Sequence, residues 1–489
     1  MRHSKRVAVL AAGGLLALLA ACSSDLNVTD PNNPDTKRAF STVEDVQALA
    51  VNSFRHWFIA NQHEDPNAGM AVMADALSSA WGNFGMRFNS AEPRIPYANS
   101  TSSGDAEMAQ TPWDRNYSAL GEANDALNAG ANGLDIGDEY KALATLVQGL
   151  TLGNIALIFD QGYVVDDATP IPATVPLVKY TEVEKAALAK FDAVIAMSKD
   201  ADWDLGDIPG LDLTGPRMAQ LASTMAARLM AYTPRNATEN AAVDWAKVAS
   251  YAAAGITSEA APDTFSVTIA GDGYNLWYDD VKGYGDDQGW MRVNMRIIHE
   301  LIPSEPAVFS DCNYVPPAQD TLPSASPDKR LGTDFTYYHS IPFDPARGCW
   351  HFSYWTHERY VEASFFGTGP LPVVLGAEND LLLAEALVRS GGDMNKAADL
   401  VNRTRVGRGG LPAVTADPAA LLAAIQYEQD VELLASGGGV QYYDQRRIDG
   451  LEPGTPHHLP VPASELQLDG LSTYTFGGAG HEEAPLPWQ

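Results

Sequence analysis

The sequence is short of the residues that the best-known catalytic and metal-binding motifs require. It has three cysteines and ten histidines in 489 residues, and they form neither a C-x-x-C nor an H-E-x-x-H pattern, so we expect no metal site of those kinds. The glycine-rich signatures of phosphate and dinucleotide binding are missing, as is the G-x-S-x-G turn of serine hydrolases. The sequence therefore gives no sign of a zinc enzyme, a nucleotide-dependent enzyme or a serine hydrolase.

Positive charge is also scarce. The chain has 32 Lys and Arg against 62 Asp and Glu, a formal net charge of −30. A field of this sign repels phosphate backbones and anionic lipid headgroups. We therefore expect no nucleic-acid partner, and we expect any membrane attachment to come from a covalent lipid.

The first 21 residues have the pattern of a bacterial lipoprotein signal. Three positive residues precede an apolar run, too short to span a membrane as a helix, that ends in Leu19-Ala20-Ala21-Cys22. The small residues allow cleavage just before Cys22, whose thiol can then carry a lipid such as palmitate. Residues 1–21 are thus a predicted signal peptide and Cys22 a predicted lipidation site. The alternative is an ordinary secretory peptide with an incidental cysteine.

The segment that follows Cys22 cannot bury a core. Residues 23–35 are rich in Ser, Asn, Asp and Pro, so we interpret residues 22–40 as a lipidated tether. Ser23, rather than Asp, follows the cysteine, which favours the outer membrane over retention in the inner one. The remaining residues, 41–489, are predicted to form a single domain.

The periodicity of the domain indicates a mainly α-helical fold. From Thr42 onward apolar residues recur at helical spacing between Gly, Pro and Asp breaks. In the segment 181–198, Thr181 is placed to cap the helix with Glu184 three residues on, ahead of one apolar stripe. The pair Asp417-Pro418 has the pattern of a cap and first turn. The other predicted helices cover residues 42–60, 112–130, 138–159, 216–232, 243–255, 377–390, 394–405 and 418–435.

Between residues 262 and 366 the character of the sequence changes to a loop-rich, aromatic insertion. This segment holds 19 of the 44 aromatic residues. Carbohydrate recognition needs flat apolar faces for sugar rings and polar groups for their hydroxyls. We therefore predict ligand contacts in this insertion and in the loop after a helix that ends near Ala80; the alternative is that the rings only pack the loops onto the helices. The predicted contacts are Trp277, Tyr278, Tyr284, Trp290, Trp81 and Asn83.

The insertion also contains two cysteines and two acidic pairs. In an exported protein Cys312 and Cys349 are expected to form a disulfide. The pairs Asp279-Asp280 and Asp286-Asp287 could offer oxygen ligands to calcium, although their spacing is not that of an EF-hand. Solvated turns are the simpler interpretation of these aspartates, and we predict no cofactor.

The two ends of the chain are similar to a known family. In order and spacing, the C-terminal motifs resemble those of the SusD/RagB family of outer-membrane nutrient-uptake lipoproteins, and Leu26–Asn32 after the lipid cysteine looks like that family's start. Two dipeptides differ, because members commonly have Glu-Arg at Glu428-Gln429 and an acidic residue before Gly at Ser436-Gly437. The motifs that carry the resemblance are Glu378–Ala386, Gly391–Asp393, Val401–Arg405, Val431–Leu434, Tyr443–Arg447 and Leu459–Leu466.

The resemblance implies a fold, a role and a partner. The fold would contain tetratricopeptide-like helix pairs on which irregular loops build a ligand surface. The protein would capture an oligosaccharide or similar polymer fragment at the cell exterior and deliver it to a SusC-like TonB-dependent transport barrel, without chemistry of its own. Peptide capture within the same fold and a helical-repeat envelope scaffold are the alternatives.

Acidic residues and arginines in the C-terminal motifs raise a further alternative, glycoside hydrolysis. Paired carboxyls of opposite protonation state could perform it. An internal salt-bridge network is the commoner explanation of such residues on apolar helices, and the resemblance implies binding rather than cleavage. The side chains concerned are Glu385, Glu428, Glu432, Asp444, Arg405 and Arg446.

Overall fold

The structure is a computed structural model that describes residues 42–170, 175–206, 208, 213–259, 264–269, 289–313, 325–361 and 369–488. The predicted signal peptide, the tether and Cys22 lie outside these residues. So do Trp277, Tyr278, Tyr284 and the two acidic pairs proposed for calcium.

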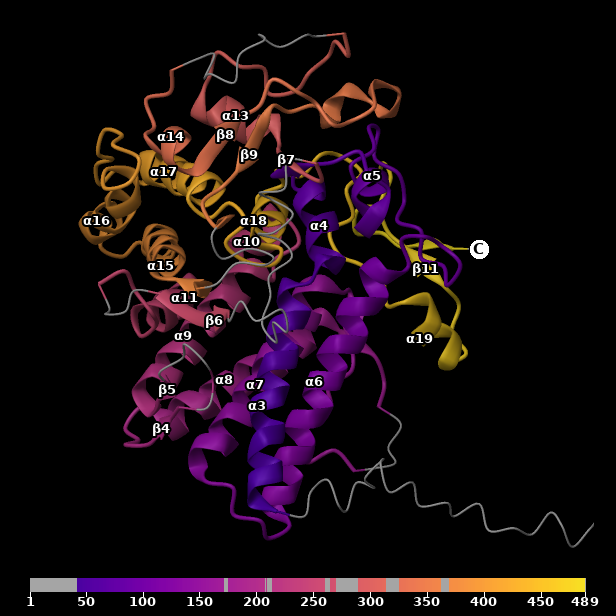
Figure 1. Ribbon diagram of the computed structural model, residues 1–489. Coiled ribbons are helices and arrows are strands. Elements are labelled where there is room, and N and C mark those ends of the chain that lie inside the picture. Colours follow the sequence, from indigo (N-terminus) through magenta and orange to yellow (C-terminus); the bar gives the residue numbers. More distant parts are fainter. Residues whose placement is uncertain are drawn as a thin grey trace, which may run out of the picture.

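The described part of the chain is mainly α-helical, which confirms the fold class. The longest helices form a bundle, and shorter ones surround it (Figure 1). The helices are α3 (Val43–Gln62), α4 (Glu64–Met73), α5 (Met86–Asn89), α6 (Glu107–Ala131), α7 (Asp138–Ile158), α8 (Tyr180–Ser198), α9 (Gly215–Tyr232), α10 (Ala237–Ala241), α11 (Trp245–Ala253), α13 (Met295–Leu301), α14 (Arg330–Asp334), α15 (Gly376–Ser390), α16 (Met394–Arg405), α17 (Pro418–Val431), α18 (Val440–Arg447) and α19 (Ala463–Leu468).

Strands are short and occur in antiparallel pairs. The pairs found in the described ranges are β1 (Leu77–Ser78) with β7 (Arg292–Val293), β2 (Gln161–Gly162) with β3 (Val178–Lys179), β4 (Asp204–Leu205) with β5 (Leu213–Thr214), β6 (Thr264–Ile269) with β10 (Gly369–Leu375), β8 (Phe335–Tyr337) with β9 (Trp355–His357), and β11 (Tyr474–Thr475) with β12 (Leu486–Pro487). None is long enough to be stable without the helices against which it packs.

Helices that follow one another in sequence pack side by side. Helix α6 packs on α7, α7 on α8 and α8 on α9, while α3 covers α6 and α7 (Figure 1). Gly149 allows α7 and α8 to approach closely, since a Cβ atom there would lie 2.8 Å from the ring of Phe191. Within the described ranges α7 is the helix long and apolar enough to cross a membrane, but 89% of its apolar window is buried inside the molecule. It is the central core helix of the bundle.

Of two helix caps predicted from the sequence, one is correct and the other is wrong. Asp417 caps α17 as predicted, with its carboxylate 2.8 Å from the backbone nitrogen of Ala420. The predicted cap at Thr181 is wrong, because α8 begins at Tyr180 and has no side-chain cap. Strand β3 holds the backbone extended up to Lys179, so the helix starts directly where the strand ends and Thr181 already lies in its first turn.

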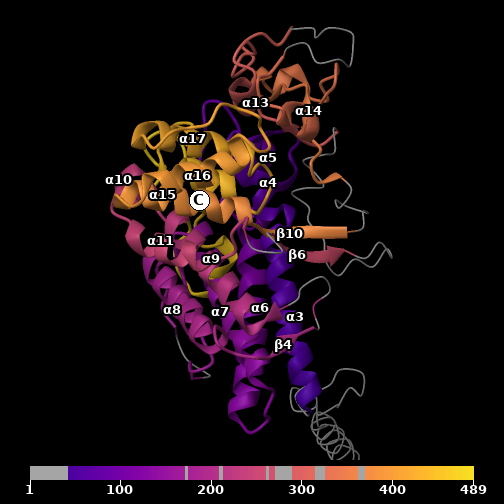
Figure 2. The same cartoon turned by 90° about the vertical axis from the view of Figure 1, so that its left-hand side faces the viewer.

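The aromatic segment leaves and re-enters the helical body at one place. Helices α11 and α15, which precede and follow it, pack directly against each other. Strands β6 and β10 pair from Gly369 opposite Ile269 to Leu375 opposite Thr264, and Figure 2 shows this pair projecting beside the bundle. The β6–β10 pair therefore brings the two ends of the segment between α11 and α15 together.

Arginines and carboxylates of the C-terminal motifs form a buried network. Arg330 lies 2.6 Å from Glu428 and 3.1 Å from Glu432, and all three side chains are at most 1% exposed. Arg447 contacts Glu385 at 2.6 Å and Asp444 at 2.5 Å. The salt-bridge interpretation of these acids is thus confirmed.

Gln429, one of the two unusual sequence positions, lies inside this network, and Arg405 lies beside it. Gln429, where the family commonly has arginine, donates to Glu385 at 3.4 Å. Arg405 lies at the network's edge, where its Nε donates to the carbonyl of Pro412 at 2.9 Å. Local ion pairing at residue 429 is therefore replaced by a hydrogen bond.

Arg446 is buried, and no carboxylate of the described residues forms an ion pair with it. Its Nη atoms donate to the carbonyls of Leu157 at 2.9 Å and Tyr232 at 2.7 Å, which belong to the C-terminal turns of α7 and α9. Unpaired carbonyls at a helix C-terminus carry partial negative charge, so two helix ends take the place of a counter-ion. Burial lowers the pKa of Arg446 to about 9.

Candidate functional site

The β1–β7 pair brings together two loops that are distant in sequence. Leu77 lies opposite Val293 and Ser78 opposite Arg292, so the chain after β1 runs beside the chain before β7. The hydroxyl of Ser79 donates to the carbonyl of Trp290 at 2.8 Å. As a result Trp81 and Trp290, which the sequence suggested separately, are neighbours.

Three rings form the aromatic platform, which we define as Trp81, Phe84 and Trp290. The centroid of Trp290 is 6.4 Å from that of Trp81 and 6.3 Å from that of Phe84. Trp81 is 37% exposed, and its Nε1 donates to the carbonyl of Gly289 at 2.8 Å. That hydrogen bond fixes the orientation of an exposed ring, which is what a stacking surface requires.

The backbone beneath the platform is strained. Phe84 has φ 54° and ψ 29°, a left-handed conformation that costs a bulky residue on the order of 1 kcal/mol or more. Gly85 follows with φ 69°. Both residues lie in a 3-10 turn, Asn83–Gly85, and only Phe84 pays a steric cost there. The helix predicted to end near Ala80 ends earlier, at Met73. Asn83 is exposed beside the rings.

A strap from the aromatic segment, Asp344–His351, holds the platform from the other side. Arg347 donates from Nη1 to the carbonyl of Ala80 at 2.8 Å. Its guanidinium carbon lies 5.6 Å from the centroid of the Trp81 ring, within the range of a cation–π contact. Nothing in the sequence pairs Arg347 with Trp81, and sequence reasoning missed it.

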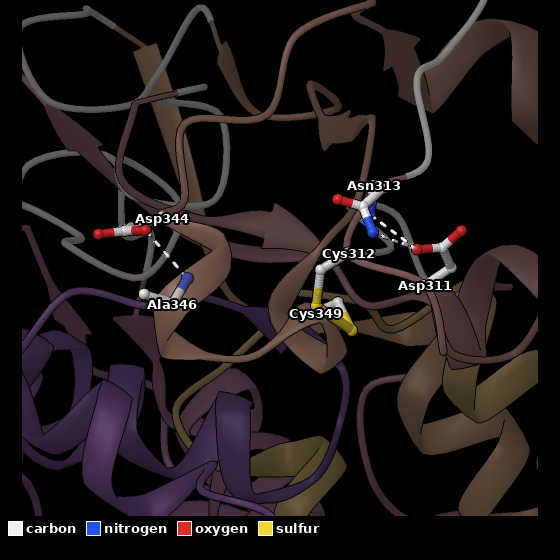
Figure 3. Close-up of a disulfide and its surroundings, with 6 residues drawn as sticks. All are labelled: Asp311, Cys312, Asn313, Asp344, Ala346 and Cys349. Atoms are coloured by element: carbon white, nitrogen blue, oxygen red, sulfur yellow. Dashed lines mark hydrogen bonds between the residues drawn. A yellow bond between two sulfur atoms is a disulfide. The ribbon is translucent and has the colours of Figure 1, made fainter.

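A disulfide anchors the strap (Figure 3). Cys312 and Cys349, which the sequence suggested as partners, are joined, with their Cα atoms 4.9 Å apart. At the other end of the strap the carboxylate of Asp344 accepts a hydrogen bond from the backbone nitrogen of Ala346 at 2.9 Å. The disulfide therefore ties the segment that carries Arg347 to Cys312, and the Asp344 bond shapes the turn before Arg347.

Below the platform lies a buried histidine. His351 is 1% exposed, and its Nδ1 lies 3.4 Å from the hydroxyl of Ser90. Burial lowers the pKa of His351 to about 4, and the charges of Arg94, Arg87 and Arg347 add to this effect. The imidazole therefore stays neutral at physiological pH, in the positive field of three arginines.

Of the six residues predicted to contact a ligand, Trp81 and Trp290 lie in the platform and Asn83 lies in the turn beside Phe84. The other three, Trp277, Tyr278 and Tyr284, lie outside the described residues, as does the proposed calcium loop. Within the described ranges no group of three or more His, Cys, Asp or Glu residues is arranged to hold a metal ion.

No family model and no curated protein matches the sequence. Solved structures do match. A SusD homolog from Parabacteroides distasonis has a TM-score of 0.62 at 12% identity and covers 87% of this chain and 93% of its own. This chain has the SusD-like fold.

Two further structures with this SusD-like fold have descriptive names. A SusD-like carbohydrate binding protein from Bacteroides fragilis matches with a TM-score of 0.58 at 15% identity, over 90% of this chain and 89% of that one. Surface glycan-binding protein A from Bacteroides uniformis matches with a TM-score of 0.59 at 16% identity, over 88% and 97%. Because identity is this low, these matches establish the fold alone.

Proposed function

We propose that this chain is a member of the SusD/RagB family that captures an oligosaccharide at the cell surface and hands it to a TonB-dependent transporter. The observation that carries the proposal is the aromatic platform on a SusD-like fold. Similar structures named for glycan binding support the ligand class.

The chemistry of the platform suits a sugar. A pyranose ring presents apolar C–H faces and a rim of hydroxyls, and the platform offers exposed indole surface beside polar groups. The guanidinium carbon of Arg347 lies 5.6 Å from the centroid of the Trp81 ring, and Asn83, two residues after Trp81, is exposed. Since the rings are fixed by hydrogen bonds and a disulfide-anchored strap, little ordering would be required on binding.

The role we propose is binding without cleavage. Hydrolysis of a glycosidic bond needs two carboxyl groups that flank the substrate. The four acids that the sequence offered for it, Glu385, Glu428, Glu432 and Asp444, are at most 2% exposed and are held by arginines. A glycan on the surface would not reach them.

The proposed location is the outer membrane, and the proposed partner is a TonB-dependent barrel. Lipid on Cys22 would hold the protein at the outer membrane, facing the exterior. A polymer fragment needs a pore that another chain supplies, so we expect a TonB-dependent barrel to co-purify in mild detergent from cells that express both. Repeated isolation without such a barrel would favour the scaffold alternative.

Calorimetric titration against a panel of oligosaccharides and peptides tests the ligand. Trp81→Ala should weaken binding of the best oligosaccharide by about tenfold or more, because a stacked ring contributes on the order of 1–3 kcal/mol. The melting temperature should change little, since the ring is 37% exposed. Trp203→Ala is the matched control: Trp203 is also partly exposed and lies beside β4, far from α5 (Figure 1).

Two results would contradict the proposal. A Trp81→Ala protein with a clearly lower melting temperature and full affinity would make the ring part of the core. Binding of peptides, but of no oligosaccharide, would replace the ligand class.

A further inference from the structure

Two of the three arginines around His351 are not neutralised by the protein. Arg94 contacts Asp75 at 3.0 Å and is almost completely buried. Arg87 and Arg347 have no carboxylate within 4.0 Å anywhere in the described residues. Both are partly exposed, and both belong to the segments that form the platform.

Unneutralised arginines beside a binding surface are unexpected in this chain. Acidic residues outnumber basic ones by 62 to 32, so a carboxylate partner is easy to supply. Two of the buried arginines, Arg330 and Arg447, use this supply. A guanidinium has five N–H donors, and the side-chain hydrogen bond of Arg347 to the protein, to the carbonyl of Ala80, occupies one of its nitrogens.

We propose that the platform selects an acidic glycan, whose uronate or sulfate group pairs with Arg347 and Arg87. This inference rests on the proposed function. A guanidinium matches a carboxylate or sulfate with two parallel hydrogen bonds, whereas a hydroxyl can use only part of its donor fork. Because the guanidinium carbon of Arg347 is 5.6 Å from the Trp81 centroid, a sugar that touches the exposed part of that ring comes within reach of the charge.

The net charge of the protein does not oppose this pairing at contact. At physiological ionic strength, charges separated by more than about 8 Å are largely screened in solvent. Carboxylates farther away than this weigh little against the two guanidinium groups at contact with a bound sugar.

Matched ligand pairs test the inference directly. The first pair is oligogalacturonate and its methyl ester, and the second is a chondroitin sulfate oligomer and its desulfated form. Within each pair the sugar rings are the same and the charge differs. By calorimetric titration the wild-type protein should bind the charged member of at least one pair about tenfold more tightly or better, as expected for a hydrogen bond to a charged group.

Variants assign the preference to the arginines. Arg87→Gln should weaken binding of the charged ligand more than binding of the neutral one, because its guanidinium carbon lies 5.8 Å from the centroid of Phe88, a ring outside the platform. Arg347→Gln should remove most of the preference, and Arg347→Lys should restore part of it by returning the charge without the planar fork. Arg217→Gln is the control, on α9 beside β5 at the opposite end of the bundle (Figure 1), and should change nothing.

Three results overturn the inference. Equal affinity for charged and neutral members of both pairs, with loss of binding in Trp81→Ala, refutes the acidic ligand and leaves glycan capture intact. Suppose that Arg347→Gln lowers the affinity for the charged and the neutral ligand of a pair equally, and that Arg87→Gln changes neither affinity. Arg347 would then only position Trp81, and the inference would be refuted. Binding of no glycan at all refutes the proposed function and this inference together.

Discussion

Replacing Glu385 by glutamine removes one negative charge from the centre of the buried C-terminal network. Glu385 is 2% exposed, and each of its carboxylate oxygens lies 2.6 Å from a nitrogen of Arg447. The Nε of Arg389 is also 2.6 Å from the carboxylate. Burial by itself raises the pKa of Glu385, but the two guanidinium groups outweigh burial and hold it at about 2, against an ordinary value of 4.5.

The size of the effect follows from this pKa. Since the folded-state pKa is depressed, ionised Glu385 stabilises the fold above pH 4.5, and the stabilisation is lost as the pH falls towards 2. A shift of about 2.5 units corresponds to about 3 kcal/mol of unfolding free energy at pH 7. Glutamine imitates the protonated acid, so Glu385→Gln should cost about 3 kcal/mol at pH 7 and only about 1 kcal/mol at pH 3.

Equilibrium unfolding in urea, followed by circular dichroism at pH 7, 5 and 3, measures this dependence under conditions where unfolding reverses. Glu182→Gln is the matched control, because Glu182 also pairs with a cation on its own helix but its side chain is 55% exposed. That variant should stay within about 0.5 kcal/mol of wild type. A cost below about 1 kcal/mol for Glu385→Gln at pH 7, or a cost that does not change with pH, would refute the reasoning.

Four further outcomes are expected. Cys349→Ser opens a loop that spans a sequence separation of 37 and should cost up to about 4 kcal/mol in the chain-entropy model, measured by urea unfolding with and without reductant. Glu300→Gln should be more stable than wild type at pH 8 and close to it at pH 5, because burial raises the pKa of Glu300 to about 8 and glutamine imitates the acid that the folded wild type has already protonated at pH 5; a difference in urea midpoint that does not change with pH would contradict this. Arg446→Met should destabilise the protein by about 3 kcal/mol or more, because it strips partners from buried carbonyls of two helices; a melting temperature equal to that of wild type would show that these bonds add nothing. Cys22→Ala should abolish labelling by a radioactive fatty acid, and equal label in both proteins would exclude lipidation at this residue.

The helices were predictable because their signal is local. Apolar residues at helical spacing give the existence of α8 and α17, and the Asp417-Pro418 pair gives the start of α17 correctly. The start of α8 was missed because it depends on the pairing of β3 with β2, which holds Lys179 extended. A tertiary contact there overrides a local capping pattern.

The candidate site was predictable only in pieces. Composition suggested Trp81 and Trp290 as ligand contacts in two separate loops. The contact between them depends on the pairing of β1 with β7, each two residues long. Strands this short leave no readable alternation in a sequence. Arg347 was missed for the same reason, because its position over Trp81 results from the strap and not from any local motif.

Arginine serves two different purposes in this chain, and the burial of the side chain distinguishes them. A buried guanidinium has lost its water, so it must find carboxylates, as Arg447 does, or the carbonyls of helix ends, as Arg446 does. A partly exposed guanidinium such as that of Arg347 keeps part of its water and needs no carboxylate for stability, and the fold uses it for one hydrogen bond and one cation–π contact. What the charge adds at that position is attraction for an anion that the protein itself does not supply. Substitution of a buried arginine should therefore change the free energy of unfolding. Removal of the charge of Arg347 should mainly change the affinity for a ligand.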